Sequence, residues 1–152
     1  MTTTANGLDE LKALANTDLG QTGWIQISQD RVNMFADATG DHQWIHVDKE
    51  KAAAGPFGGT IAHGYLTLAM IIPLFGELLS VGGIGMGINY GLNKVRFPAP
   101  VQVGSKIRLS GRLGDIEPAG ASAVQVVADF TVEVEGSDKP ACVAQAVYRY
   151  YA

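Results

Sequence analysis

The sequence has little cysteine and little positive charge, and both shortages limit what the protein can be. Cys142 is its only cysteine, so no internal disulfide can form and a thiolate metal site has no second ligand. We expect a small core residue there. The 11 basic residues are outnumbered by 15 acidic ones, for a formal net charge of −4. Such a chain lacks the overall attraction to phosphate backbones that non-specific nucleic-acid binding needs, so we expect no nucleic-acid partner.

Segments that would direct the chain into a membrane are also missing. Residues 1–20 contain no basic stretch followed by a continuous apolar stretch, which argues against a secretory signal. The main apolar segment, Tyr65–Phe75, is shorter than the roughly 20 residues of a membrane span and contains Pro73. We therefore expect a cytoplasmic protein that has no membrane partner.

The composition that is present is that of an ordinary globular protein. Of the 152 residues, 47% are apolar and 17% are charged, which predicts one domain over residues 1–152. Residues 1–20 are expected to form an N-terminal extension with a short amphipathic helix, because Leu8, Leu11 and Leu14 recur at helical spacing.

Helix signals dominate the first half of the chain. Ser28 can cap a helix that Gly40 stops, and Asp48 can cap a short helix after it. Tyr65–Phe75 is apolar on every face, which predicts a buried central helix.

Strand signals dominate from Gly82 onward. The apolar residues of Val124–Val134 recur at every second position, and three further strand-like runs accompany this one. No helix long enough for a parallel crossover separates these runs. The sequence therefore predicts an α+β fold in which a mostly antiparallel sheet wraps around the apolar helix.

The stretch "FADATGDHQWIHVD" places a carboxylate and an imidazole in one irregular segment. Asp41 directly follows the helix-stopping Gly40, and His46 lies five residues further on. One such group can hold or deprotonate a water while the other delivers a proton. The alternative is that Asp41 caps a turn and His46 is a hydrogen-bonded core residue, and the pattern alone leaves both interpretations open.

Gly64 stands at the start of the apolar helix. Unpaired N–H groups at a helix N-terminus can polarise a carbonyl oxygen, and a glycine leaves room for a substrate to approach the backbone. The alternative is a glycine needed for helix packing or for an unusual dihedral angle.

The segment 94–112 carries five basic side chains and no acidic one, although the chain as a whole is acidic. It is either the polar face of two strands or a docking surface for an anionic group such as a nucleotide phosphate.

Three stretches, "GDHQWIHVDKEKA", "IAHGYLTLAM" and "NKVRFPAPVQVGSKI", resemble the MaoC-like dehydratases, in particular the R-specific enoyl-CoA hydratases. The resemblance runs from about residue 22 to the end. The family motif is G-D-x-N-P-[LIV]-H with a small residue six places later. This sequence keeps it at Gly40, Asp41, Ile45, His46 and Ala52, while Gln43 and Trp44 replace the usual Asn and Pro.

The resemblance implies a hot-dog fold, a homodimer and an acyl-CoA thioester substrate. It implies that Asp41 and His46 are the catalytic pair, that the Gly64 N–H binds the thioester carbonyl, and that no metal or other cofactor is needed. With CoA as the carrier, basic residues of the 94–112 segment become expected phosphate contacts, namely Arg96, Lys106 and Arg108.

Two other functions fit the same resemblance. A thioesterase on this fold would release free CoA thiol from saturated acyl-CoA. A non-catalytic acyl-CoA-binding subunit would bind enoyl-CoA without hydrating it.

Overall fold

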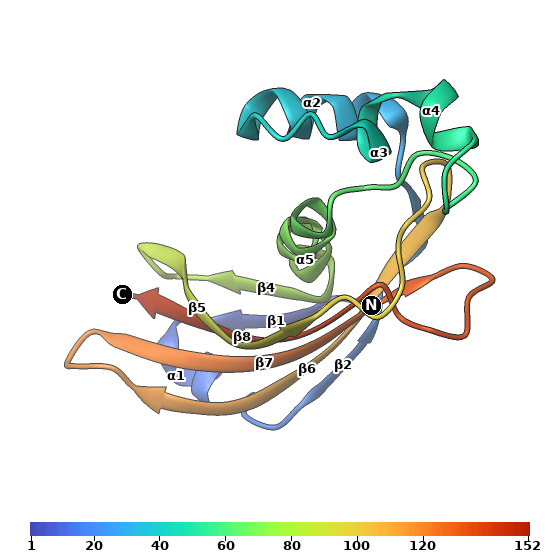
Figure 1. The fold of residues 1–152 in the computed structure, drawn as a ribbon. Coiled ribbons are helices and arrows are strands. Elements are labelled where there is room, and N and C mark those ends of the chain that lie inside the picture. Colours follow the sequence, from blue (N-terminus) through green and yellow to red (C-terminus); the bar gives the residue numbers. More distant parts are fainter.

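A curved antiparallel sheet folds around one long helix, α5 (Gly64–Leu78), in the computed structural model, which describes all 152 residues (Figure 1). The strand order of the sheet is β2-β6-β7-β8-β5, and β3 also pairs with β6. All these pairings are antiparallel. The bounds of these strands are β2 Asp18–Gln21, β3 Ile25–Gln26, β5 Met86–Arg96, β6 Lys106–Pro118, β7 Ala123–Val134 and β8 Cys142–Tyr151. The predicted α+β hot-dog architecture is confirmed.

β7 shows how the sequence pattern produces the two faces of this sheet. Val126, Phe130 and Val132 are at most 2% exposed and point toward α5. Gln125 and Asp129, which directly precede Val126 and Phe130, point to the opposite face, because successive side chains of a strand alternate. The apolar side of the sheet and the helix therefore share one core.

The central helix packs against the sheet through only part of its circumference. Leu66, Met70 and Leu74 are at most 6% exposed, whereas Tyr65 is 73% exposed and Ile72 is 42% exposed. The helix is central, as predicted, but it is not buried on every side in the single chain, because the sheet curls around one flank and leaves the other open.

The N-terminal residues belong to the same body. β1 (Thr3–Asn6) pairs in parallel with β4 (Leu79–Gly82), the strand that continues directly from α5. The short helix α1 (Leu8–Lys12) buries Leu11 completely in the main core. The expected N-terminal extension is thus packed into the fold.

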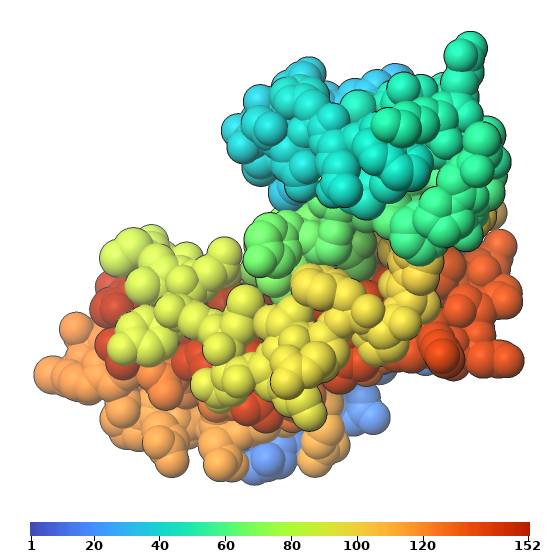
Figure 2. Space-filling model, in the orientation of Figure 1, coloured from blue at the N-terminus to red at the C-terminus, as the bar shows by residue number.

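Three further helices overhang the sheet, with α5 in the recess beneath them (Figure 2). They are α2 (Gln29–Thr39), α3 (Trp44–Val47) and α4 (Lys49–Ala53). Ser28 caps α2 by accepting from the Arg31 N–H, and Asp48 caps α4 by accepting from the Lys51 N–H, as predicted. No helix is long and apolar enough to span a membrane.

Candidate active site

A pocket of about 500 Å³ lies where the overhanging helices meet the start of α5. Asp41, His46 and Gly64, the three residues that the sequence singled out, all line it. The rest of the lining comes from α2, from the N-terminal end of α5 and from the segment after β5, and consists of Phe35, Thr39, His63, Tyr65 and Phe97.

Asp41 presents a largely free carboxylate to this pocket. Gly40 ends α2 in the left-handed conformation, with φ of 81°, which glycine adopts without steric cost, and this turns the chain so that Asp41 leaves the helix axis. The side chain is exposed, and its one hydrogen bond, from the Gln43 N–H, is long at 3.4 Å. The carboxylate oxygens therefore keep nearly all of their capacity to accept hydrogen bonds from a ligand or a water.

His46 lies on the one-turn helix α3 and is 6% exposed. Its Nδ1 is 2.7 Å from the carbonyl oxygen of Ile61. Because a carbonyl can only accept, Nδ1 carries the hydrogen, and Nε2 of the neutral ring offers a lone pair. Nε2 has no hydrogen-bond partner within the protein, so this ring is oriented at one nitrogen and available at the other.

His63 adds a second imidazole that the sequence did not assign to the site. It is the N-cap residue of α5 and 3% exposed, and its ring stacks on that of His46 with centroids 3.9 Å apart. Its Nε2 is 2.9 Å from the backbone oxygen of Asp41. The only sequence signal was its place directly before Gly64, and nothing in that spacing indicates that it folds back onto His46.

The side chains of Asp41, His46 and His63 offer ligand atoms that all lie within 4.8 Å of one another. A carboxylate and two imidazoles can hold a divalent cation, and the same groups can also move a proton to and from a bound water.

The first turn of α5 supplies an unpaired donor to the pocket. Thr67 is the first residue whose N–H bonds back along the helix, to the His63 carbonyl, so the Gly64 N–H is free. Gly64 does not have a positive φ, and a Cβ built on it would meet only the Phe97 ring, at an ordinary contact distance of 3.5 Å. Neither its dihedral angle nor packing within the chain requires glycine here, so space beside its backbone is left for something outside the chain.

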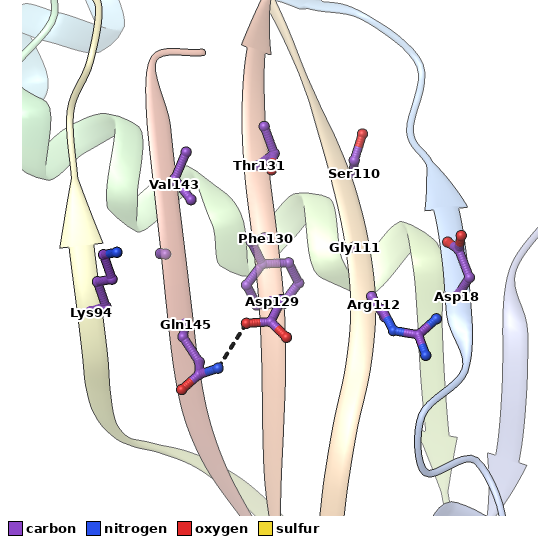
Figure 3. A pocket seen from close by; sticks show the side chains of 11 residues that line it. Asp18, Lys94, Ser110, Gly111, Arg112, Asp129, Phe130, Thr131, Val143 and Gln145 are labelled. Atoms are coloured by element: carbon purple, nitrogen blue, oxygen red, sulfur yellow. Dashed lines mark hydrogen bonds between the residues drawn. The ribbon is translucent and has the colours of Figure 1, made fainter.

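A second hollow of similar size, about 510 Å³, lies on the face of the sheet turned away from α5, with the helix behind the strands in Figure 3. Its charged side chains are spread over separate strands and include Lys94, Arg112, Asp18 and Asp129. The Gln145 amide donates to Asp129 at 2.9 Å. No imidazole lines this hollow, so it offers no group suited to proton transfer near neutral pH.

The basic residues of segment 94–112 do not gather into one patch on the single chain. Arg96 ends β5 directly before Phe97, which lines the Asp41 pocket. Lys106 starts β6 opposite Gln26 of β3. Arg108 is ion-paired with Glu133 and lies over the Trp24 ring, 4.4 Å from its centroid. Arg96 is thus the one that adjoins the pocket lining, and the CoA contacts stay a prediction.

Comparison with known proteins gives a consistent family match. The family model described as "MaoC like domain" matches residues 11–135. The chain is 56% identical to 3-hydroxyacyl-thioester dehydratase Z of Mycobacterium tuberculosis, over 98% of this chain and 99% of that protein. It is 35% identical to 3-hydroxybutyryl-CoA dehydratase of Methylorubrum extorquens, over 73% of this chain and 71% of that protein.

The solved structure of an R-hydratase from Pseudomonas aeruginosa has the same fold. It superposes with a TM-score of 0.69 at 22% identity, covering 93% of this chain and 83% of that one.

Proposed function

Because the chain belongs to the MaoC-like dehydratase family, whose members are hydro-lyases, we propose that it adds water reversibly across the 2,3 double bond of a trans-2-enoyl-CoA and so forms an (R)-3-hydroxyacyl-CoA. The observation that carries the proposal is the meeting of three groups on one pocket: the free carboxylate of Asp41, the unpaired Nε2 of His46 and the unpaired N–H of Gly64.

The pair acts on a single water. Asp41 accepts one hydrogen bond from the water and holds it, while Nε2 of His46 accepts the other hydrogen and takes that proton as the oxygen bonds to C3. The electron pair of the double bond moves through C2 onto the thioester oxygen, and the Gly64 N–H stabilises the negative charge that develops there. The enolate then collapses, C2 takes the proton from His46, and both water-derived groups have entered from one face.

These steps move protons and electron pairs with no overall oxidation or reduction, and Asp41, His46 and the Gly64 N–H supply the groups that they use. The proposed reaction therefore uses no metal ion and no redox cofactor. The corresponding test is dialysis against a strong chelator, which should leave the rate of hydration unchanged. A substrate carried on CoA also suits a cytoplasmic enzyme, because that compartment holds the acyl-CoA pool.

The working form is a homodimer. β5 is an edge strand of the sheet, and ten of its eleven residues are exposed, including Met86, Ile88, Tyr90 and Leu92. Beside it, an apolar hollow of about 300 Å³ lies between β5 and the open flank of α5 around Ile72. An unpaired edge next to apolar surface favours association with a second copy, which would satisfy the strand and cover the helix.

The deciding experiment follows loss of the conjugated enoyl-thioester absorbance over a series of trans-2-enoyl-CoA chain lengths. Steady loss of absorbance, with a product that an (S)-specific 3-hydroxyacyl-CoA dehydrogenase does not oxidise, is the expected result. Release of free CoA thiol from saturated acyl-CoA would instead identify a thioesterase. Saturable binding of every enoyl-CoA without any hydration would identify a non-catalytic binding subunit.

A further inference from the structure

His63 is a buried imidazole with one unpaired nitrogen, which is unusual for a residue that only fills space. Its ring is 3% exposed and lies between the rings of Phe35, at 4.8 Å, and His46, at 3.9 Å. Its Nδ1 is buried and has no hydrogen-bond partner. A buried polar atom without a partner is destabilising, and a phenyl ring would fill the same space without one. Packing alone therefore does not explain a histidine at this position. The explanation has to come from its other nitrogen, Nε2.

That other nitrogen holds the backbone of Asp41. Nε2 of His63 lies 2.9 Å from the Asp41 carbonyl oxygen, and because a carbonyl only accepts, Nε2 is the donor. The other bonds of Asp41 are weak: its N–H reaches the hydroxyl of Thr39 at 3.4 Å, and its carboxylate receives the Gln43 N–H at 3.4 Å. The bond from His63 is thus the shortest one made by Asp41, and it fixes the turn from which the carboxylate projects.

The same ring also restrains His46. The two imidazoles are nearly parallel, with 24° between their planes, and the Ile61 carbonyl fixes the rotation of His46 from its far edge. The geometry requires a hydrogen on Nε2 of His63 and no hydrogen-bond partner at its Nδ1. A charged ring in its place would repel the imidazolium that forms on His46 during proton transfer.

We infer that His63 is a positioning residue that holds the Asp41 backbone and the His46 ring so that the carboxylate and Nε2 meet on one water. This inference rests on the proposed hydration. It assigns His63 no contact with the substrate, so losing it should reduce turnover far more than substrate binding, since an error of about 1 Å in the placement of a reacting group can cost roughly a hundredfold in rate.

Two substitutions separate the hydrogen bond from the stack. His63→Phe keeps a ring against His46 but removes the donor to Asp41, and His63→Gln keeps an N–H donor but removes the ring. We expect His63→Phe to lower kcat by at least about 30-fold with KM within about threefold of the parent, and His63→Gln to recover a substantial part of that loss. Melting temperatures are measured beside the kinetics of both.

A neighbouring histidine provides the matched control. His42 adjoins Asp41 in sequence but is exposed, and its Nε2 bonds to the Asp37 carboxylate at 2.9 Å, outside the pocket. His42→Gln should leave kcat and KM unchanged. In an Asp41→Asn background, adding His63→Phe should cost much less than it does in the parent, because its effect passes through Asp41.

The outcomes divide cleanly. If the parent is active and a folded His63→Phe variant has near-parental kcat, the role is overturned. It is also overturned if His63→Phe lowers kcat by the same factor in the Asp41→Asn background as in the parent. If His63→Phe does not fold, His63→Leu, which lacks both the donor and the ring, takes its place. A folded His63→Leu variant of near-parental kcat, or one whose loss is carried by KM rather than kcat, overturns the role. A loss of kcat that becomes much smaller in the Asp41→Asn background supports it. A parent that hydrates no enoyl-CoA overturns the proposed function itself, which is a different result from an active parent with unaffected variants.

Discussion

Replacing Asp41 by asparagine separates a catalytic carboxylate from one that only shapes a turn. In the folded protein the Asp41 side chain is exposed and accepts one long bond, 3.4 Å from the Gln43 nitrogen. Asparagine keeps an acceptor oxygen for that bond, and a hydrogen bond of ordinary length contributes only about 1 kcal/mol net. The free energy of unfolding should therefore change by less than about 1 kcal/mol, which is a shift of at most about 4 °C in Tm for a chain of this size.

The effect on the rate should be much larger. If the carboxylate holds the water, its loss should lower kcat by at least about 100-fold, which equals about 2.7 kcal/mol of barrier. The assay is loss of enoyl-thioester absorbance with crotonyl-CoA, read against Asp37→Asn, the same change at an exposed carboxylate that pairs with His42. His46→Gln should cost a similar factor, and the double variant far less than the product of the two, because the groups act on one water.

A structural role for Asp41 predicts the reverse of both results. It would give a Tm lowered by more than about 6 °C with nearly parental activity per folded molecule. A stable Asp41→Asn variant that turns over near the parent rate would remove the carboxylate from the mechanism, and with it the assignment of the pocket as an active site.

Three other perturbations test separate parts of the structure. Ile88→Glu on the exposed edge strand should shift sedimentation from a dimer toward the 16.0 kDa monomer, and a parent that is monomeric at micromolar concentration would contradict the dimer. Arg96→Glu should raise KM in a salt-dependent way more than it lowers kcat, whereas Arg112→Glu, on the outer face, should not; equal KM in both would separate Arg96 from CoA. Burial raises the pKa of the Cys142 thiol to about 11 and also raises the pKa of Tyr148. The unfolded chain therefore loses these protons first, so stability should fall as pH rises from about 9 to 11; chemical denaturation at pH 8, 9, 10 and 11 measures this, and a flat profile would refute it.

Local signals in the sequence were enough to predict the parts of the fold that depend on neighbouring residues. Ser28 and Gly40 bound α2 as expected, because capping and the left-handed turn involve only the adjacent backbone. The alternation in Val124–Val134 gave the inner face of β7 for the same reason. Asp41, His46 and Gly64 do line one pocket. The family motif indicated the first two, and the position of Gly64 at the start of the apolar helix, with the wider resemblance, indicated the third.

Features that depend on the path of irregular segments could not be predicted from the sequence. The stack of His63 on His46 forms only if residues 54–63 bring the chain back to the end of α2 before α5 begins. The glycines in that segment allow many other backbone paths. The basic residues of segment 94–112 look like one cluster in sequence, but Arg96 and Arg108 lie on strands with different surroundings. The sequence also could not predict that one flank of α5 is open in the single chain. An apolar helix face has the same sequence pattern whether the sheet or a second chain covers it.

Every group in the proposed chemistry belongs to one continuous segment, residues 41–64, which carries no strand of the sheet and forms a single β-bridge, between Ile61 and Gln102. Its helices α3 and α4 are one turn each, while the sheet is held by long strand ladders around a common core. Regions with little buried structure can open at a small fraction of the free energy of global unfolding. Residues 60–63 are buried and anchor Gly64 to the core, so only the part that carries Asp41 and His46 is expected to open at low cost. We predict that the protein loses activity reversibly on warming before it loses its tertiary structure.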